Sequence, residues 1–195
     1  MWLINAFLAL KVYFDGGFLH GVYKASSGGV LLTVPQADFT ERPIFQGSYF
    51  FGEGGIVRGS TEAEYLAFIE ALHLIRHALN IDLIDRIDFH GDSEVVIRNL
   101  KSRKINVRRK SSLTQLEMLD NTAKCLLDAI PKITTFHHVK RGLNSLADGL
   151  ARKALDRAVT QTHTLSDSHL FLASNAAPAG HDVMFSANYP GPPDI

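Results

Sequence analysis

The chain has 195 residues, of which 46% are hydrophobic and 21% charged, and its 20 acidic side chains balance its 20 basic ones. This length favours one domain with a single core, and the composition is that of an ordinary globular protein rather than a fibrous or disordered one. The zero net charge gives no general attraction to nucleic acid, so any such function depends on where the charges lie.

The N-terminal residues and the single cysteine indicate the cellular compartment in which the protein is expected. Residues 1–10 form an apolar N-terminal extension that is too short to span a bilayer, which takes ~20 residues, and that lacks the basic start of a secretory signal. Cys125 has no partner for an internal disulfide, and its apolar helical surroundings predict a place in the core. We therefore expect a cytoplasmic protein that does not enter the membrane.

The first half of the chain predicts three strands and a long helix. We expect strands over residues 11–15, 28–34 and 45–51, and a helix over about residues 61–79. The first strand should end at Asp15, because Gly16 and Gly17 follow it directly. The next two strands flank a polar turn and predict an antiparallel hairpin. The helix carries an apolar stripe at helical spacing, with Phe68, Ala71, Leu72, Ile75, Ala78 and Leu79 on one face.

The second half continues with alternating strands and helices. We expect strands over residues 86–89 and 133–139, and helices from Ser93 to Leu100, over 113–129, and from Asn144 or Ser145 to about 158. The predicted order is β-β-β-α-β-α-α-β-α. Periodicity fades afterwards, so residues 11–158 should form the folded domain and residues 159–195 a mostly disordered tail.

Four carboxylates lie at the ends of these predicted elements. Asp15 and Asp92 follow strands, where ligand sites form in mixed sheets, and Glu64 and Asp148 lie in the opening turns of helices. Taken alone, each is also explained as a turn residue or as an acid that complements a helix dipole. Glu62 fits that structural role better than Glu64, because we expect it to face solvent.

Taken together, the four acids predict a metal site. Several carboxylates at one sheet edge repel one another, and divalent cations relieve that repulsion. Oxygen ligands with open water positions suit Mg²⁺. Two such ions ~3.5–4 Å apart can hold an attacking water and a leaving oxygen for phosphodiester hydrolysis.

The sequences around the four acids resemble those of one family. The segments are Phe-Asp15-Gly-Gly, Thr-Glu-Ala-Glu64-Tyr, Gly-Asp92-Ser and Asn144-Ser-Leu-Ala-Asp148-Gly-Leu-Ala. In this order and spacing they are similar to the type 1 ribonucleases H, closest to the short form of plants and many prokaryotes. The similarity covers about residues 11–157.

The resemblance implies a fold and an activity. The fold would be the α/β ribonuclease H-like fold, a five-stranded mixed sheet flanked by helices. The activity would be endonucleolytic hydrolysis of the RNA strand of RNA–DNA hybrids, leaving 5′-phosphate and 3′-hydroxyl ends. Asp15, Glu64, Asp92 and Asp148 would hold two Mg²⁺ ions, with Mn²⁺ as the alternative. We expect a monomer whose partner is the hybrid.

Five further residues are candidates for contact with the substrate. The backbone at Gly16 and Gly17 could approach the 2′-hydroxyls of the RNA, although an ordinary tight turn would also explain these glycines. Ser60 and Thr61 lie where the family often has Thr-Asn-Asn contacting both strands of the hybrid. Asn144 matches a family position near the active site, and a plain helix cap is the alternative.

The basic stretch Lys101–Lys110 leaves two interpretations open. Longer family members carry a basic protrusion there that grips the duplex, and a solvated loop is the alternative. The same members have a histidine before the last helix that is linked to product release, whereas here His137 and His138 lie in the preceding strand and receive no role. Two rival functions also remain: a related nuclease of other duplex preference, such as the reverse-transcriptase-associated type, or a non-catalytic hybrid- or RNA-binding module.

Overall fold

The computed structural model describes residues 8–20, 24–52, 57–104 and 114–167. The strands are β1 (Leu8–Phe18), β2 (Ser26–Pro35), β3 (Glu41–Gly52), β4 (Ile84–Gly91) and β5 (Ile133–His138). The helices are α1 (Ser60–Ala78), α2 (Glu94–Ser102), α3 (Gln115–Asp128) and α4 (Ser145–Asp167), with 3-10 turns η1 (Ile81–Leu83) and η3 (Arg141–Leu143). The predicted order of strands and α-helices is confirmed. None of the described helices is long and apolar enough to cross a membrane.

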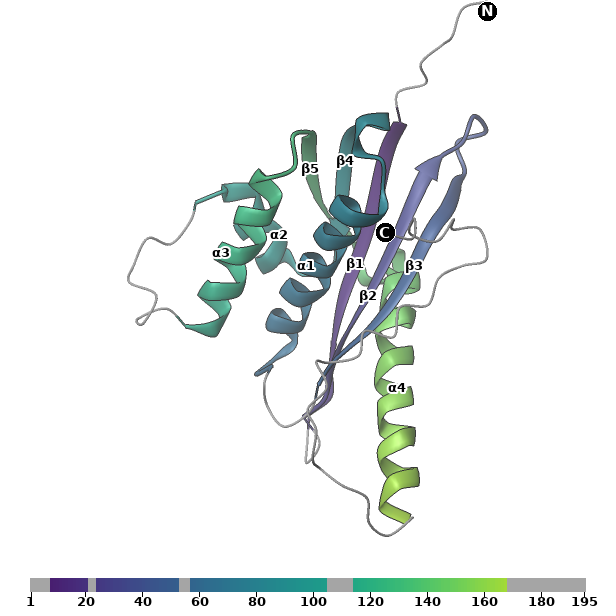
Figure 1. Ribbon diagram of the computed structural model, residues 1–195, viewed down its shortest axis with the longest axis vertical. Helices are drawn as coiled ribbons and strands as arrows, with labels where there is room; N and C mark the ends of the chain where they lie inside the picture. The colour runs from purple at the N-terminus through teal and green to yellow at the C-terminus, as the bar shows by residue number, and fades with distance from the viewer. Residues whose placement is uncertain (1–7, 21–23, 53–56, 105–113, 168–195) are drawn as a thin grey trace, which may run out of the picture.

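The five strands form one mixed sheet in the order β3-β2-β1-β4-β5. β2 pairs antiparallel with β1 and with β3, so the predicted hairpin is confirmed, while β4 runs parallel to β1 and to β5. Helices α1 and α3 lie on one side of the sheet and α4 lies on the other, against β1, β2 and β3 (Figure 1). The expected α/β architecture, a five-stranded mixed sheet flanked by helices, is therefore confirmed.

The core lies between α1 and the central strands. On the predicted stripe of α1, Phe68, Ala71, Leu72 and Ile75 are fully buried. The Phe68 ring packs 5.1 Å from the ring of Phe14 on β1 and 5.0 Å from that of Phe89 on β4, measured between ring centroids. Burial of such side chains is the main term that stabilises the fold, and here it fixes α1 over the two strands that lead to the acids.

β1 is longer than the sequence predicts. It begins at Leu8, inside the predicted extension, and it continues through both glycines to Phe18, so the expected end at Asp15 is wrong. The glycines do not end the strand because Gly16 and Gly17 pair with residues 28 and 27 of β2. Neither glycine lies in a tight turn. Residues 1–7 of the predicted extension lie outside the described residues.

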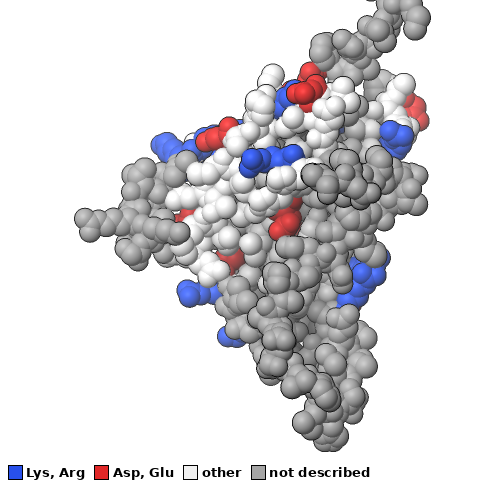
Figure 2. All heavy atoms as spheres, viewed as in Figure 1, with Lys and Arg blue, Asp and Glu red and all other residues white. Residues whose placement is uncertain are grey.

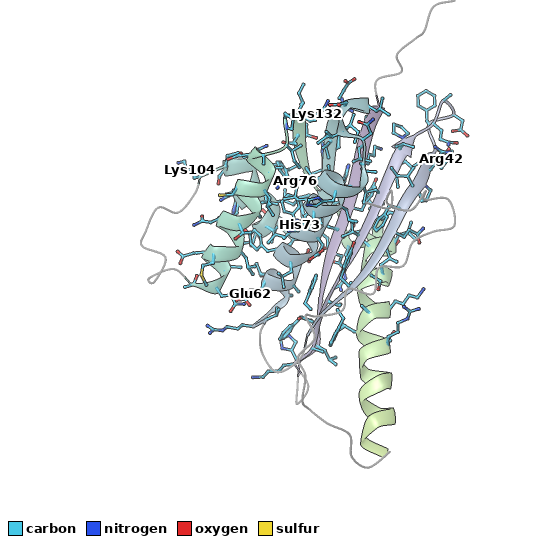
Figure 3. All side chains as sticks on the ribbon, viewed as in Figure 1. Arg42, Glu62, His73, Arg76, Lys104 and Lys132 are labelled. Carbon is cyan, nitrogen blue, oxygen red and sulfur yellow. The ribbon has the colours of Figure 1, made fainter. Side chains whose placement is uncertain are left out.

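Two expectations about individual side chains are wrong. Cys125 is exposed, and the neighbouring Lys124 is buried in its place. The Lys124 ammonium donates to Asp120 at 2.6 Å and to the carbonyl of Lys104 at 2.8 Å, which compensates its charge. Glu62, labelled at the start of α1 in Figure 3, is only 8% exposed, because its carboxylate turns back to accept a hydrogen bond from the Arg58 backbone.

The predicted end of the last helix is also too early. Helix α4 continues to Asp167, past the expected boundary at residue 158. Its buried side chains among those described are Ala147, Ala151 and Ala154, which are small and allow close packing on the sheet. Residues 168–195 of the predicted tail lie outside the described residues.

The first part of the basic stretch has structural contacts. Arg103 binds Asp128 at 2.6 Å, donates to Thr134, and lies 5.9 Å from the centre of the Phe136 ring. Lys104 follows the end of α2, at the left of Figure 3, and its backbone carbonyl accepts a hydrogen bond from Lys124 of α3. The rest of the stretch, residues 105–110, lies outside the described residues. On the face seen in Figure 2, the described acidic and basic side chains are interspersed rather than gathered into one basic patch.

Candidate active site

Three of the four predicted acids meet at one place. Asp15, Glu64 and Asp92 each offer a carboxylate oxygen, and these oxygens lie within 4.8 Å of one another. The sheet register explains the approach of two of them, because Tyr13 on β1 lies opposite His90 on β4 and the acids follow two residues later on each chain segment. Glu64 comes from the beginning of α1, which packs on β1.

Gly16 lets α1 approach β1 closely enough for this meeting. A Cβ atom at Gly16 would lie 2.1 Å from the backbone nitrogen of Glu64 and 2.3 Å from the carbonyl carbon of Ala63. Real side chains do not tolerate such contacts, so only glycine fits here without moving the helix. The demonstrated role of Gly16 is therefore to permit the contact between strand and helix.

Two acids of the cluster, Asp15 and Glu64, resist ionisation. Burial, followed by the charges of Asp92 and Asp148, raises the pKa of Asp15 from 3.8 to about 7. Burial and the charges of Asp15 and Asp92 raise the pKa of Glu64 well above its usual value. Buried carboxylates that repel one another lower the stability of a folded protein. Their presence therefore indicates a functional site.

The donor set fits a divalent cation. The Oε2 atom of Glu64 is buried and has no hydrogen-bond partner among the described residues. A buried carboxylate oxygen without a partner is costly, and a cation would supply the missing interaction. Three hard oxygen donors within one small space suit Mg²⁺ or Mn²⁺. Asp15, Glu64 and Asp92 could therefore hold a metal ion.

Asp148 lies beside this cluster with partners of its own. It is not among the three acids whose oxygens lie within 4.8 Å of one another, but its charge contributes to the raised pKa of Asp15. Its carboxylate accepts from Arg141 at 3.0 Å and pairs with Arg152 at 3.0 Å. The structure therefore shows three convergent acids and a fourth that is neutralised by arginines at the margin.

Sequence reasoning missed three side chains at this margin. Arg141 and Arg152 bind Asp148, and the Nε2 atom of His138 lies 3.1 Å from the backbone carbonyl of Asp92. The spacing of four residues between Asp148 and Arg152 is a signal for a helical ion pair and could have identified Arg152. His138 ends β5 and Arg141 lies in the 3-10 turn η3 that follows it, and neither position has a comparable sequence signal.

The remaining predicted site residues lie near the cluster in different settings. Ser60 is the exposed first residue of α1 and Thr61 is half-buried beside it. Gly17 lies inside β1. Asn144 is buried before α4, and its side chain donates to the carbonyl of Phe14 at 2.9 Å instead of capping the helix. The structure thus ties Asn144 to the strand that carries Asp15.

A separate cavity lies beneath the start of α4. It has a volume of about 290 Å³ and is lined by Tyr13, Leu31, Thr33, Glu41, Pro43 and residues 143–147. None of the four acids lines it. The carboxylate of Glu41 is engaged there by Lys11, Tyr13 and Thr33. This cavity is therefore distinct from the acidic cluster.

Comparisons with known proteins identify the family and the fold of the chain. The profile of a family described as reverse transcriptase-like matches residues 13–154. Among solved structures, the chain is similar to RNase H1 from the archaeon Halobacterium salinarum, with 26% identity and a TM-score of 0.55 over 76% of this chain and 98% of that one. A search of curated proteins found no match.

Two further structures share the fold at lower identity. LC11-RNase H1, isolated from compost by a metagenomic approach, is 24% identical with a TM-score of 0.60, over 77% of this chain and 98% of that one. Another structure of LC11-RNase H1 contains an RNA/DNA hybrid. The RNase H domain of prototype foamy virus is 18% identical with a TM-score of 0.54, over 76% of this chain and 95% of that one.

Proposed function

The chain belongs to the reverse transcriptase-like family of ribonuclease H-like proteins, and we propose that it hydrolyses the RNA strand of RNA–DNA hybrids at the cluster of Asp15, Glu64 and Asp92, with Asp148 as a fourth ligand. The observation that carries the proposal is the convergence of three carboxylates, one with a buried and unpartnered oxygen. A module that only bound nucleic acid would have no use for such mutual repulsion. The solved RNase H1 bound to an RNA/DNA hybrid supports the choice of substrate.

The residues of the site would hold two divalent cations. When bound, these ions acidify the attacking water and stabilise the charge that develops on the leaving oxygen. Asp15, Glu64 and Asp92 supply the negative charge that would attract the cations, and the protons held by Asp15 and Glu64 because of their raised pKa values would be displaced by metal. Asp148 would join them after releasing one or both of its arginines. The products would be 5′-phosphate and 3′-hydroxyl ends.

The arginines released from Asp148 would lie beside the phosphate backbone. Arg141 and Arg152 are largely exposed, with 72% and 64% of their side chains accessible, so they can exchange a carboxylate for a phosphate. Gly17, Ser60, Thr61 and Asn144 remain candidates for contact with the hybrid. Ser60 is the best placed of these, because it is exposed at the beginning of the helix that carries Glu64.

Cleavage of matched duplexes tests the proposal. Labelled RNA–DNA, RNA–RNA and DNA–DNA duplexes of one sequence are incubated with the protein in Mg²⁺ or in Mn²⁺. We expect cutting of the RNA strand of the hybrid alone. Cutting of another duplex in preference to the hybrid would assign the chain to a related nuclease, and binding without any cutting would assign it to a non-catalytic module.

A further inference from the structure

Two buried serines of the sheet hold the helix that carries Asp148. The hydroxyl of Ser27 on β2 donates to the carbonyl of Ala151 at 2.7 Å, and that of Ser48 on β3 donates to the carbonyl of Leu150 at 2.6 Å. Ser27 is fully buried and Ser48 is 4% exposed. Both acceptors are backbone atoms of α4, so the contact sets the position of the helix itself.

The backbones of β2 and α4 also touch directly. A Cβ atom at Gly29 would lie 2.0 Å from the carbonyl oxygen of Ala147 and 2.7 Å from the nitrogen of Ala151. Gly17 leaves room for the hydroxyl of Ser27, because a Cβ atom there would lie 2.5 Å from it. The backbone contact at Gly29 therefore limits how closely α4 can approach the sheet. The hydroxyls of Ser27 and Ser48 fix the position of α4 along the sheet.

These contacts surround Asp148 in the sequence. Ala147 precedes it, and Leu150 and Ala151 follow it within one helical turn. Before the helix, Asn144 binds the carbonyl of Phe14, the residue next to Asp15. Hydrogen bonds before Asp148, from Asn144, and after it, from Ser27 and Ser48, therefore set the position of Asp148 relative to Asp15.

From this arrangement we infer that Ser27 and Ser48 are positioning residues, which place the carboxylate of Asp148 for metal binding beside Asp15, Glu64 and Asp92. The inference rests on the proposed function, since it takes Asp148 as a metal ligand. Metal and catalytic groups must be held within ~0.5 Å of their working geometry, and a displacement of ~1 Å can cost ~100-fold in rate. Loss of both hydroxyls removes the links that give this precision.

The test compares metal affinity in two backgrounds. Mg²⁺ binding is measured by titration calorimetry for the full chain and for Ser27→Ala/Ser48→Ala, first with Asp148 present and then with Asp148→Asn. We expect the dissociation constant to rise about fivefold or more in the first background and to change little in the second, where no carboxylate remains to be positioned. The kcat for hybrid cleavage should fall with the double substitution.

A neighbouring serine provides the matched control. Ser26 is buried on the same strand, but its hydroxyl donates to Gly52 of β3 at 3.5 Å. Ser26→Ala should leave metal affinity and cleavage unchanged. Ser48→Ala alone, on an edge strand, gives a milder variant if the double substitution prevents folding, and it should show a smaller effect with the same dependence on Asp148.

The outcomes separate this inference from the proposed function. An equal change of metal affinity in both backgrounds, or no change in either, would overturn the positioning role. If the protein cuts no hybrid but metal affinity depends on the serines only when Asp148 is present, the proposed function fails and the positioning role stands. If the protein cuts the hybrid but the serine substitutions do not change metal affinity in the presence of Asp148, the proposed function stands and the positioning role fails.

Discussion

Arg152 holds both carboxylate oxygens of Asp148, with its Nε atom 3.0 Å from Oδ2 and its Nη2 atom 3.4 Å from Oδ1. Arg141 adds a third contact at 3.0 Å to Oδ1. The same oxygens would be needed by a metal ion. A cation that binds Asp148 therefore competes with two guanidinium groups, and the strength of these ion pairs affects the affinity of the site for metal.

Replacement of Arg152 tests this competition. In Arg152→Gln, we expect the Mg²⁺ concentration for half-maximal cleavage to fall by about 1.4- to fivefold, which corresponds to the ~0.2–1 kcal/mol of an exposed ion pair. Lys153→Gln changes the same charge on the next residue of α4 and serves as the control, with little effect expected. A rise in the Mg²⁺ requirement of Arg152→Gln would show instead that the arginine orients Asp148 for the metal.

The raised pKa of Asp15 predicts how the stability of the metal-free protein depends on pH. Between pH 3.8 and about pH 7, the folded protein keeps a proton on Asp15 that the unfolded chain has lost. The free energy of unfolding should therefore fall as pH rises through this window, by up to ~1.4 kcal/mol per pH unit from this group. Glu64 acts in the same direction, because its pKa is also raised.

Asp15→Asn isolates this contribution. We expect the metal-free variant to melt at the same temperature as the parent protein or higher at pH 8, because the repulsion within the cluster is relieved, while cleavage is lost. The difference in stability between the two proteins should shrink toward pH 4. The difference is the quantity to measure, because burial lowers the pKa of His90 to about 4 and gives an opposite slope below pH 6.5. A large loss of stability in Asp15→Asn would show the acid to be structural.

Gly16→Ala should disrupt the approach of β1 to α1. The added Cβ atom would meet the backbone of Glu64 at 2.1 Å, so we expect a loss of roughly 1–3 kcal/mol or more in unfolding free energy and a large loss of cleavage. Gly149→Ala is the matched control, since a Cβ atom there meets nothing within 4 Å. That change should stabilise α4 by up to ~1 kcal/mol. Denaturant unfolding of both variants checks the prediction, and equal stabilities would contradict it.

The sequence predicted much of the fold and all three of the acids that converge, Asp15, Glu64 and Asp92. The helical stripe around Phe68 and the strand-end position of Asp92 follow from periodicity and local residue preferences. The continuation of β1 through Gly16 and Gly17 could not be predicted, because it depends on the register in which the two glycines pair with β2. Strand pairing of this kind overrides the local tendency of glycine to end a strand.

The compensation of charges at Asp148 and Lys124 was predictable only in part from local patterns. The sequence predicted Asp148 as one of four equal ligands, whereas the structure pairs it with Arg141 and Arg152. The burial of Lys124 depends likewise on Asp120 and on a backbone carbonyl outside its helix. The contacts of Asp148 with Arg141 and of Lys124 with the Lys104 carbonyl join separate elements, so periodicity does not predict them. The pairs Asp148–Arg152 and Asp120–Lys124 lie four residues apart within one helix, and their spacing is a signal that the sequence does contain.

The most direct test of the central claim is the rate at which this protein and Asp92→Asn cut the RNA strand of one RNA–DNA hybrid as Mg²⁺ is varied. Asp92 is half-buried at the cluster, and its substitution removes one of the three convergent ligands without changing the size of the side chain. We expect Mg²⁺-dependent cleavage by the parent protein, and a loss of at least ~100-fold in Asp92→Asn with the melting temperature retained. Equal cleavage by the two proteins, or cleavage by the parent that chelation of metal does not stop, would contradict the assignment of this cluster as a metal-dependent active site.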